Sequence, residues 1–252
     1  EKKNLPHSKL ELKGEIPADR FMSYWGKALA QITSSVQIPG FRKGKAPEKL
    51  VLERAGEAAI LQEAAELALQ EAYVEIMTAE KIDALGRPEV IITKLAKDNP
   101  LNFTIITDVY PEIKLPDYKK LASKITATPL EMAEAKDGAD EATQKHRAEE
   151  KRRLEIMKAI TSAMNLDLPA VMVETELDKM LAEFSHDITR MGLKLEDYLK
   201  HLKKTAVELK ADWRGQAVER VKFGLTFHEI AIAEKLNKPD AVWQLLEKKP
   251  EK

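Results

Sequence analysis

Several features that would assign a protein to a familiar class are missing from this chain of 252 residues. It contains no cysteine, which excludes disulfide bonds, thiolate catalysis and zinc–thiolate sites and fits a reducing cytoplasm. No apolar run approaches the roughly 18 residues that a membrane-spanning helix needs, so we expect no membrane contact. The formal net charge is only −1, although charged residues make up 33% of the chain. Attraction to nucleic acid would therefore need a local basic patch.

Motifs that predict catalysis are also missing. The five histidines are scattered, and "HEIAI" lacks the second histidine of a zinc-protease helix because Ile232 stands in its place. There is no GxGxxG, and "GFRKGKAP" is not a phosphate-binding loop, since its glycine spacing differs and Ala46 replaces the hydroxyl residue. With 42 acidic residues, carboxylate pairs are expected by chance. We therefore predict no enzyme activity, no metal site and no cofactor.

The first 116 residues predict an α+β domain. Apolar and polar residues alternate in "KLELKGEI", which is typical of a half-buried strand. Helical spacing predicts a helix over about 18–35, and an alanine- and glutamate-rich helix after Pro47 is broken near Gly56. Two β-branched segments, "GRPEVIITKL" and "LNFTIITDVYPEI", flank a turn signal and predict a hairpin. These elements predict an antiparallel sheet with two helices over residues 1–116.

The rest of the chain predicts a helical domain. We expect a charged linker over 117–145, followed by an all-α domain with helical arms over 146–252, in an elongated molecule. Pro169 marks a helix start and Gly192 a turn. The chain begins with Glu1 rather than Met, so whether a leader was removed stays open.

The stretch "IPGFRKGKAP", residues 38–47, is the most unusual part of the sequence. Its two glycines permit sharp turns, and its two prolines stiffen the entry and exit. Between them stand Phe41 and three cations, Arg42, Lys43 and Lys45. Such a set suits an anionic surface with a small apolar pocket or a stackable base, as on structured RNA and its proteins. Loop chemistry alone leaves two interpretations open: Phe41 packed back on its own helices, which it favours, or Phe41 as a binding anchor.

"GFRKGKAP" resembles the ribosome-binding signature of the bacterial trigger factor family of ribosome-associated chaperones. The flanks agree in order and spacing over about residues 9–121; they are "KLELKGEIPADRF", "LVLERAGEAAILQEA", "LGRPEV" and "VYPEIKLPDYKKL". The resemblance implies that the loop docks on ribosomal protein and rRNA beside the exit of the nascent-chain tunnel. It therefore favours Phe41 as an anchor. The residues that match the signature are Gly40, Phe41, Arg42, Lys43, Gly44, Lys45 and Pro47.

The second half resembles the helical C-terminal chaperone domain of the same family. The segments that carry the resemblance are "EEKRRLEIMKAI", "LDLPAVMVETELDKML", "MGLKLEDYLK" and "ERVKFGLTFHEIAIAEKL". Between the two parts the family normally carries an FK506-binding-protein-like prolyl isomerase domain of about a hundred residues. Here only 117–145 stands in that place, which is too short for such a fold. The resemblance therefore implies a short form without isomerase activity, and whether that domain was lost naturally or deleted stays open.

A chaperone of unfolded chains needs exposed apolar surface that adapts to many sequences, and methionine suits this because it is unbranched and polarisable. We predict an ATP-independent cytoplasmic chaperone that shields nascent polypeptides at the tunnel exit, while client preference and a homodimer stay open. Any single one of the candidate client residues is more often core than contact. These candidates are Met157, Met172, Met180, Phe184, Met191, Phe223 and Phe227.

Two alternatives stay open. The chain could be a ribosome- or RNA-binding factor without chaperone activity, with a helical half that serves dimerisation or scaffolding. It could also be an extracytoplasmic chaperone of the SurA type. The basic loop argues against that second alternative, because no ribosome lies outside the cytoplasm.

Overall fold

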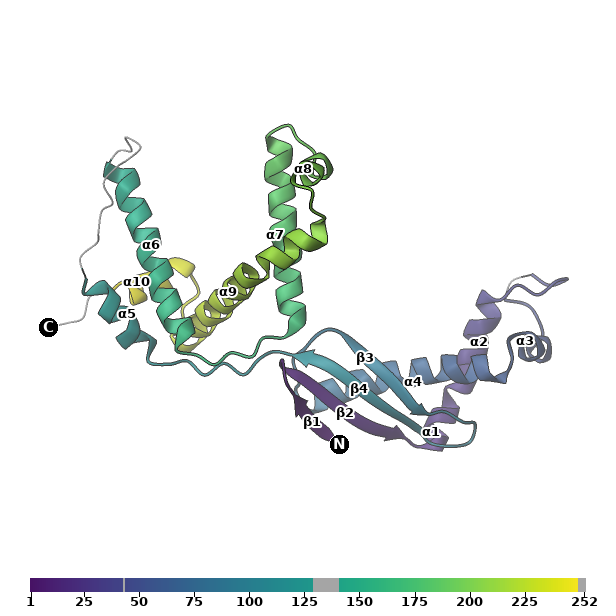
Figure 1. Cartoon of the computed structure of the whole chain (residues 1–252). Coiled ribbons are helices and arrows are strands. Elements are labelled where there is room, and N and C mark those ends of the chain that lie inside the picture. The colour runs from purple at the N-terminus through teal and green to yellow at the C-terminus, as the bar shows by residue number, and fades with distance from the viewer. Residues whose placement is uncertain (43, 129–140, 249–252) are drawn as a thin grey trace. The chain divides into compact units, whose positions relative to one another are not determined.

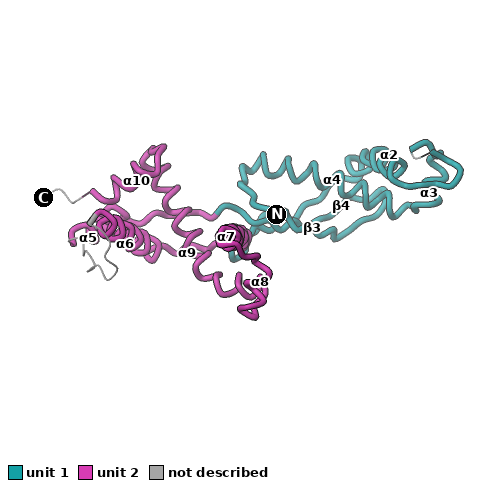
Figure 2. Tube along the Cα trace, turned by 90° about the horizontal axis from the view of Figure 1, so that it is seen from above, with its two compact units in different colours: residues 1–110 teal, residues 111–252 magenta. Residues whose placement is uncertain are grey.

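A computed structural model of the chain describes residues 1–42, 44–128 and 141–248. The chain divides into two compact units, residues 1–110 and 111–252 (Figures 1 and 2). The first unit is α+β and the second is helical, which confirms the predicted fold class. The sequence placed the division after residue 116.

Unit 1 is built on a four-stranded antiparallel sheet in the spatial order β1-β2-β4-β3. Its strands are β1 (Lys2–Leu5), β2 (Lys9–Ile16), β3 (Ala84–Lys94) and β4 (Leu101–Val109). β3 and β4 pair as the predicted hairpin, and β2 is the predicted half-buried strand. The sequence did not predict β1, because none of its residues is buried and it therefore shows no apolar alternation.

Four helices complete unit 1: α1 (Ala18–Ser23), α2 (Trp25–Ser35), α3 (Glu48–Ala55) and α4 (Glu57–Ala79). Gly56 separates α3 from α4, as predicted. The prediction of a single helix over 18–35 is wrong in one respect, because the helix breaks at Tyr24 into α1 and α2. Gly26 follows two residues later, but the residue at the break, Tyr24, is neither glycine nor proline. Tyr24 is itself buried in the core, so tertiary packing rather than local propensity sets the position.

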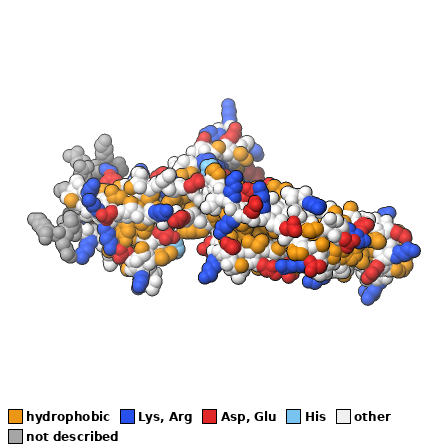
Figure 3. Space-filling view, turned by 90° about the horizontal axis from the view of Figure 1, so that it is seen from below, with side chains coloured by type: hydrophobic (Ala, Val, Ile, Leu, Met, Phe, Trp, Pro, Cys, Tyr) orange, Lys and Arg blue, Asp and Glu red, His pale blue; other side chains and the backbone are white. Residues whose placement is uncertain are grey.

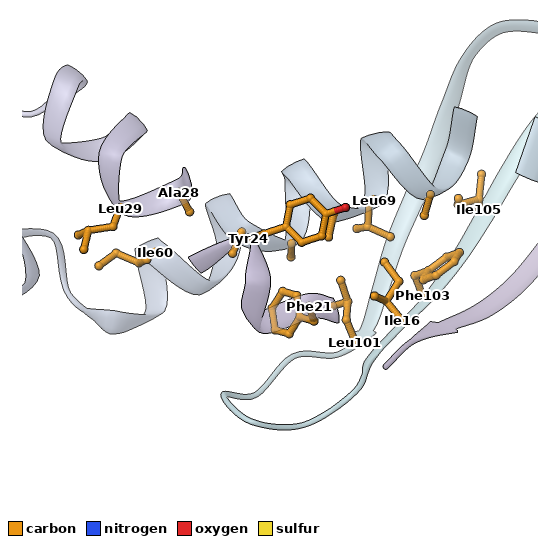
Figure 4. Close-up of a cluster of buried hydrophobic side chains, with 14 of the residues drawn as sticks. Ile16, Phe21, Tyr24, Ala28, Leu29, Ile60, Leu69, Leu101, Phe103 and Ile105 are labelled. Carbon is orange, nitrogen blue, oxygen red and sulfur yellow. The ribbon is translucent and has the colours of Figure 1, made fainter. Parts of the chain in front are cut away.

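The core of unit 1 lies between the sheet and its helices. Ile16, Phe103 and Ile105 come from the sheet and lie on the side facing Leu69 of α4 (Figure 4). Phe21 of α1 reaches the same cluster. All five side chains are at most 5% exposed, so the centre of unit 1 is well packed.

Unit 2 contains α5 (Tyr118–Thr126), α6 (Glu141–Ser162), α7 (Ala170–Arg190), α8 (Leu195–Leu202), α9 (Ala206–Ala233) and α10 (Pro239–Leu246). The sequence assigned 117–145 to a linker, but α5 lies there. Its Ala122 is buried in one cluster with residues of α6, α9 and α10, so burial recruits this segment into the helical unit. Residues 129–140 of the predicted linker lie outside the described residues.

Helix α9 connects two separate cores within unit 2. Its C-terminal half packs with α5, α6 and α10 through Phe223, Phe227 and Ile230. Its N-terminal half packs against α7 through Trp213 and Ala217. Figure 1 shows α6 and α7 contacting α9 at different places. Across the described ranges, no helix is long and apolar enough to cross a membrane.

Candidate functional site

The loop between α2 and α3 is fixed at both of its ends. Val36, Ile38 and Ala46 are half-buried and pack against the core of unit 1. Figure 1 shows this loop beyond the ends of α2 and α3, away from the sheet. The core therefore holds the base of the loop while its middle reaches outward.

Two successive turns shape the middle of the loop. The Phe41 amide donates to the Ile38 carbonyl (3.1 Å), and the Lys45 amide donates to the Arg42 carbonyl (2.9 Å). Gly40 and Gly44 stand at the third position of these turns with φ of +83° and +79°. Such values are characteristic of type II turns and strain any residue other than glycine. The sequence signature is thus explained by backbone geometry as well as by charge.

Phe41 lies between the two turns with 39% of its surface exposed. Arg42 and Lys45 are also exposed, and neither forms an ion pair with any residue that the structure describes. Lys43 lies outside the described residues. An exposed aromatic ring beside unpaired cations can meet an anionic partner without first breaking contacts within the chain.

A second candidate site is a groove of about 510 Å³ on unit 2. We call it the α6–α9–α10 groove, after the helices that supply its apolar lining, Leu154, Met157, Phe223, Phe227 and Trp243. Phe227 and Trp243 are in contact, with ring centroids 5.1 Å apart. Figure 3 shows hydrophobic side chains gathered on the surface of the helical unit, with lysine and arginine at their margins. Grooves of this size and lining are typical of sites that bind apolar ligand groups.

The charges around this groove are largely paired. The Arg153 guanidinium donates from Nε to Glu247 Oε1 (2.7 Å) and from Nη2 to Oε2 (3.3 Å). These hydrogen bonds raise the pKa of Arg153. The same guanidinium lies 5.2 Å from the Trp243 ring centroid, a cation–π geometry that holds the ring in place. The groove is therefore an apolar surface in which the charge of Arg153 is neutralised by Glu247.

The structure brings only some of the predicted client residues together. Met157, Phe223 and Phe227 line the α6–α9–α10 groove, although Met157 is only 3% exposed. The remaining four lie on α7 or at its end, in other surroundings: Met180 is buried, Met172 and Phe184 are half-buried, and Met191 is 74% exposed.

Packing explains the partial burial of Phe184. Its ring makes edge-to-face contacts with Tyr198 and Trp213, at centroid distances of 5.5 and 5.3 Å. The aromatic rings thereby connect α7, α8 and α9.

Sequence reasoning missed Leu154, Arg153 and Trp243 as groove residues. Leu154 and Met157 stand three residues apart on α6 and thus share a helix face, which is a detectable signal. The sequence around Trp243 carries no such signal, because the contact of Trp243 with Phe227 depends on how α10 packs against α9. Among the described residues, no cluster of histidine and acidic side chains could hold a metal ion.

The two units thus define a protein that combines an α+β domain displaying a basic, aromatic loop with a helical domain carrying an apolar groove. Comparison with known families assigns this combination. The family described as "Bacterial trigger factor protein (TF)" matches residues 1–142, and "Bacterial trigger factor protein (TF) C-terminus" matches residues 138–241. The chain belongs to the bacterial trigger factor family, as the sequence analysis predicted.

Curated relatives match about half of the chain. The trigger factor of Rhodococcus opacus is 36% identical over 130 residues, covering 52% of this chain and 28% of the relative. The trigger factor of Mycolicibacterium vanbaalenii is 37% identical over 142 residues, covering 56% of this chain and 30% of the relative. The matched part of the chain therefore spans less than a third of these relatives' length.

A solved structure extends the likeness in fold to nearly the whole chain. It is described as "Promiscuous Substrate Recognition in Folding and Assembly Activities of the Trigger Factor Chaperone", with a TM-score of 0.54 and 12% identity. The match covers 99% of this chain and 94% of that one. At this identity the match supports the fold.

Proposed function

We propose that this chain is a molecular chaperone that docks at the ribosomal tunnel exit through its "GFRKGKAP" loop and shields unfolded polypeptides on its helical unit without ATP. The observation that carries the proposal is Phe41, 39% exposed between two glycine turns and beside unpaired cations. Membership in the trigger factor family supports the same role. The proposed partners are ribosomal protein, rRNA and nascent chains, and the proposed compartment is the cytoplasm.

Docking combines a small apolar contribution with a salt-dependent one. Burying a whole phenylalanine side chain is worth about 1.5–3 kcal/mol, and Phe41 has 39% of its surface left to bury, so it contributes about 1 kcal/mol. The three cations contact rRNA phosphates and make the association constant depend on salt. Its logarithm falls with the logarithm of the salt concentration by about 0.7–0.9 per phosphate contact. The cations therefore dominate at low salt, and Phe41 fixes the register of docking.

Holding relies on apolar surface that remains accessible on unit 2. We propose that clients contact Phe223 and Phe227 in the α6–α9–α10 groove, with Met157 as its buried wall. Beyond the groove, we propose further contacts at Met191, which is 74% exposed at the end of α7, and at the half-buried Met172 and Phe184 of α7. The predicted contact at Met180 is not proposed, because its side chain is buried in the core between α7 and α9. Contacts of this kind are weak and reversible, which suits release of a client that then folds.

Co-sedimentation with bacterial ribosomes tests docking. We expect the triple variant Phe41→Ala, Arg42→Ala, Lys43→Ala to lose binding. A matched control, Val74→Ala, Arg87→Ala, Lys94→Ala, removes the same charge and one exposed aliphatic residue elsewhere on unit 1. It should bind like the parent.

The separate contributions can be read from salt titrations. Phe41→Ala should lower the affinity at every salt concentration without changing the salt slope. Arg42→Ala, Lys45→Ala should reduce the steepness of the fall of log K with log salt by about 1.4–1.8, because two phosphate contacts are lost. Normal binding by the triple variant would refute docking through this loop.

Aggregation of a chemically denatured client tests holding. We expect the chain to delay aggregation without nucleotide and to leave the rate of prolyl isomerisation in a model peptide unchanged. Ribosome binding without any delay of aggregation would instead favour the ribosome-binding factor that lacks chaperone activity. Clear isomerase activity would refute the prediction that residues 117–145 stand in place of an isomerase domain and that the chain has no isomerase activity.

A further inference from the structure

Helix α9 connects two hydrophobic clusters that share no other helix. The first cluster combines Val173, Leu177 and Met180 of α7 with Ala217 of α9, and among the described residues it includes none from α5, α6 or α10. The second cluster combines α5, α6, α9 and α10 and includes no described residue of α7 or α8. Figures 1 and 2 show α6 and α7 standing apart, with α9 running between them.

Ion pairs brace the N-terminal half of α9 against α7. The pairs that join the two helices are Lys210 with Asp178, Arg214 with Glu174, and Arg220 with both Glu176 and Glu183. One such pair at the surface is worth little. Together, however, they hold α9 on both sides of Gly215, because Arg214 precedes it and Arg220 follows it. We therefore treat α7, α8 and residues 206–220 of α9 as one body, the arm.

The C-terminal part of α9 is fixed to other helices. Ile230 is completely buried in the second cluster, and the ring of Phe227 lies 5.1 Å from that of Trp243 on α10. Glu234, which follows α9, accepts a hydrogen bond of 2.5 Å from the Tyr118 hydroxyl of α5. We call α5, α6, α10 and residues 227–233 of α9 the platform.

Between the arm and the platform, α9 contains Gly224. Glycine inside a helix is unfavourable relative to alanine, because it has more backbone freedom to lose. A Cβ added at Gly224 would meet no atom within 4 Å, so packing among the described residues does not require glycine there. Within the part of the chain that the structure describes, residues 221–224 also form no ion pair. Gly224 is therefore the place where α9 bends most readily.

The α6–α9–α10 groove lies across this place. Phe223, Gly224 and Phe227 all line it, and the two phenylalanines stand on opposite sides of Gly224 in the chain. Phe227 is held on the platform by Trp243, whereas Phe223 directly precedes Gly224 and follows the arm. A change in the helix at Gly224 thus changes the separation of the two rings.

From this arrangement we infer that α9 bends at Gly224 and that the bend couples the position of the arm to the width of the α6–α9–α10 groove. The straight and bent forms differ in the few backbone hydrogen bonds that span Gly224. Both hydrophobic clusters stay intact in either form, as in hinge motions of other proteins. The inference rests on the packing of unit 2 and goes beyond the proposed holding of clients.

Distances between two spin labels on the full chain test the hinge. The chain has no cysteine, so Glu155→Cys on α6 and Arg190→Cys at the end of α7 can be labelled selectively. Both positions are exposed, and neither lines the groove. We expect a broad distance distribution in the parent. Gly224→Ala should narrow it by lowering the bent population about fivefold, because alanine favours the straight helix. A single narrow distance in the parent, or an unchanged width in Gly224→Ala, would overturn the hinge.

Gly215→Ala is the matched control. It makes the same replacement in the same helix, and its added Cβ also meets no atom within 4 Å, but α7 braces the helix on both sides of it. Both alanine variants should melt at a higher temperature than the parent, whereas only Gly224→Ala should narrow the distribution. Equal narrowing in Gly215→Ala would show that the bend is not located at Gly224, and the inference would fall.

A second pair of labels checks that the platform is one body. Glu155→Cys on α6 and Gln244→Cys on α10 are both exposed and both lie on the platform. They should give one narrow distance in the parent and in both alanine variants. A broad distribution for this pair would show that the motion arises within the platform, which would overturn the hinge.

Fluorine NMR of the chain labelled with fluorotryptophan tests the coupling to the groove. Trp243 lines the groove, Trp213 packs in the arm and Trp25 packs in unit 1, and single Trp→Phe variants assign the three signals. Exchange between groove widths should broaden or split the Trp243 signal in the parent, and Gly224→Ala should sharpen it. The other two signals should not change. An unchanged Trp243 signal beside a narrowed distance distribution would refute the coupling.

Failure of the inference is distinguishable from failure of the proposed function. A chain that delays client aggregation but has the same distance distribution with and without Gly224→Ala keeps the proposed function and refutes the hinge. A chain that does not delay aggregation but narrows its distribution in Gly224→Ala refutes the proposed holding and keeps the hinge.

Discussion

Gly14 of β2 stands directly opposite Phe103 of β4 in the sheet register, and the aromatic ring covers it. A Cβ built on Gly14 would lie 2.5 Å from Phe103 Cζ and 3.0 Å from Cε2. The ring is only 3% exposed and is packed within the core of unit 1, so it cannot swing into solvent. We predict that Gly14→Ala destabilises unit 1.

The magnitude follows from two opposing effects. Overpacking a well-packed core costs about 1–3 kcal/mol. Replacing glycine inside a strand returns about 0.5–1 kcal/mol of backbone entropy. The net cost is therefore about 0.5–2 kcal/mol, which corresponds to amide exchange about two- to thirtyfold faster wherever exchange requires unit 1 to unfold.

Hydrogen exchange measured by mass spectrometry is the suitable assay, because the two units need not unfold together. Peptides from β4 should exchange faster in Gly14→Ala, and peptides from α9 should not change. Gly26→Ala in α2 is the control, since its added Cβ meets nothing within 4 Å; it should leave β4 exchange equal or slower.

A second variant checks the cause. In Gly14→Ala, Phe103→Leu the smaller side chain should relieve the contact, so the double variant should cost less than the sum of the single ones. Additive costs, or a Gly14→Ala variant as stable as the parent, would refute the argument that Phe103 fills the space above Gly14.

Two further predictions concern unit 2. Burial and its hydrogen bond to Glu234 raise the pKa of Tyr118 to about 12, against about 10 in an unfolded chain. The neutral phenol thus stabilises the fold below pH 10, and this contribution is lost as pH rises from 10 through 12. Tyr118→Phe should cost about 1–2 kcal/mol at pH 8, with a difference from the parent in denaturant titrations that shrinks above pH 10; a constant difference would contradict the linkage. Thr205→Ala removes the hydroxyl that accepts from the Glu208 amide (3.2 Å) in the capping box of α9, so amides in the first turn of α9 should exchange about three- to tenfold faster, while those near Phe227 keep their rate.

The contrast between β2 and β1 shows which local elements the sequence could predict. The alternation in β2 and the hairpin of β3 and β4 were predictable because a sheet with one buried face leaves a period of two in the sequence. β1 has no buried residue and left no such trace. The break at Tyr24 and the recruitment of α5 into unit 2 also escaped prediction, because each depends on partners far away in the chain.

The candidate sites divide in the same way. The two turns of the loop of residues 38–47 were predictable, since glycine spacing is a local property of the chain, but loop chemistry alone favoured a packed Phe41, which is 39% exposed. The α6–α9–α10 groove was only half visible: the Phe223 and Phe227 pair follows helical spacing, but Trp243 and Arg153 join it through tertiary contacts. Met180, in contrast, was a candidate for client contact and lies buried against α7 and α9 neighbours.

By itself, the sequence determined the α+β and helical halves, the basic loop and the family to which the chain belongs, because each depends on residue types at short, fixed spacing. Only the tertiary structure decided which apolar side chains remain accessible. A methionine or phenylalanine on a helix has the same local signal whether it faces a neighbouring helix or water. Whether Phe227 lines a groove depends on where α5, α6 and α10 pack against α9.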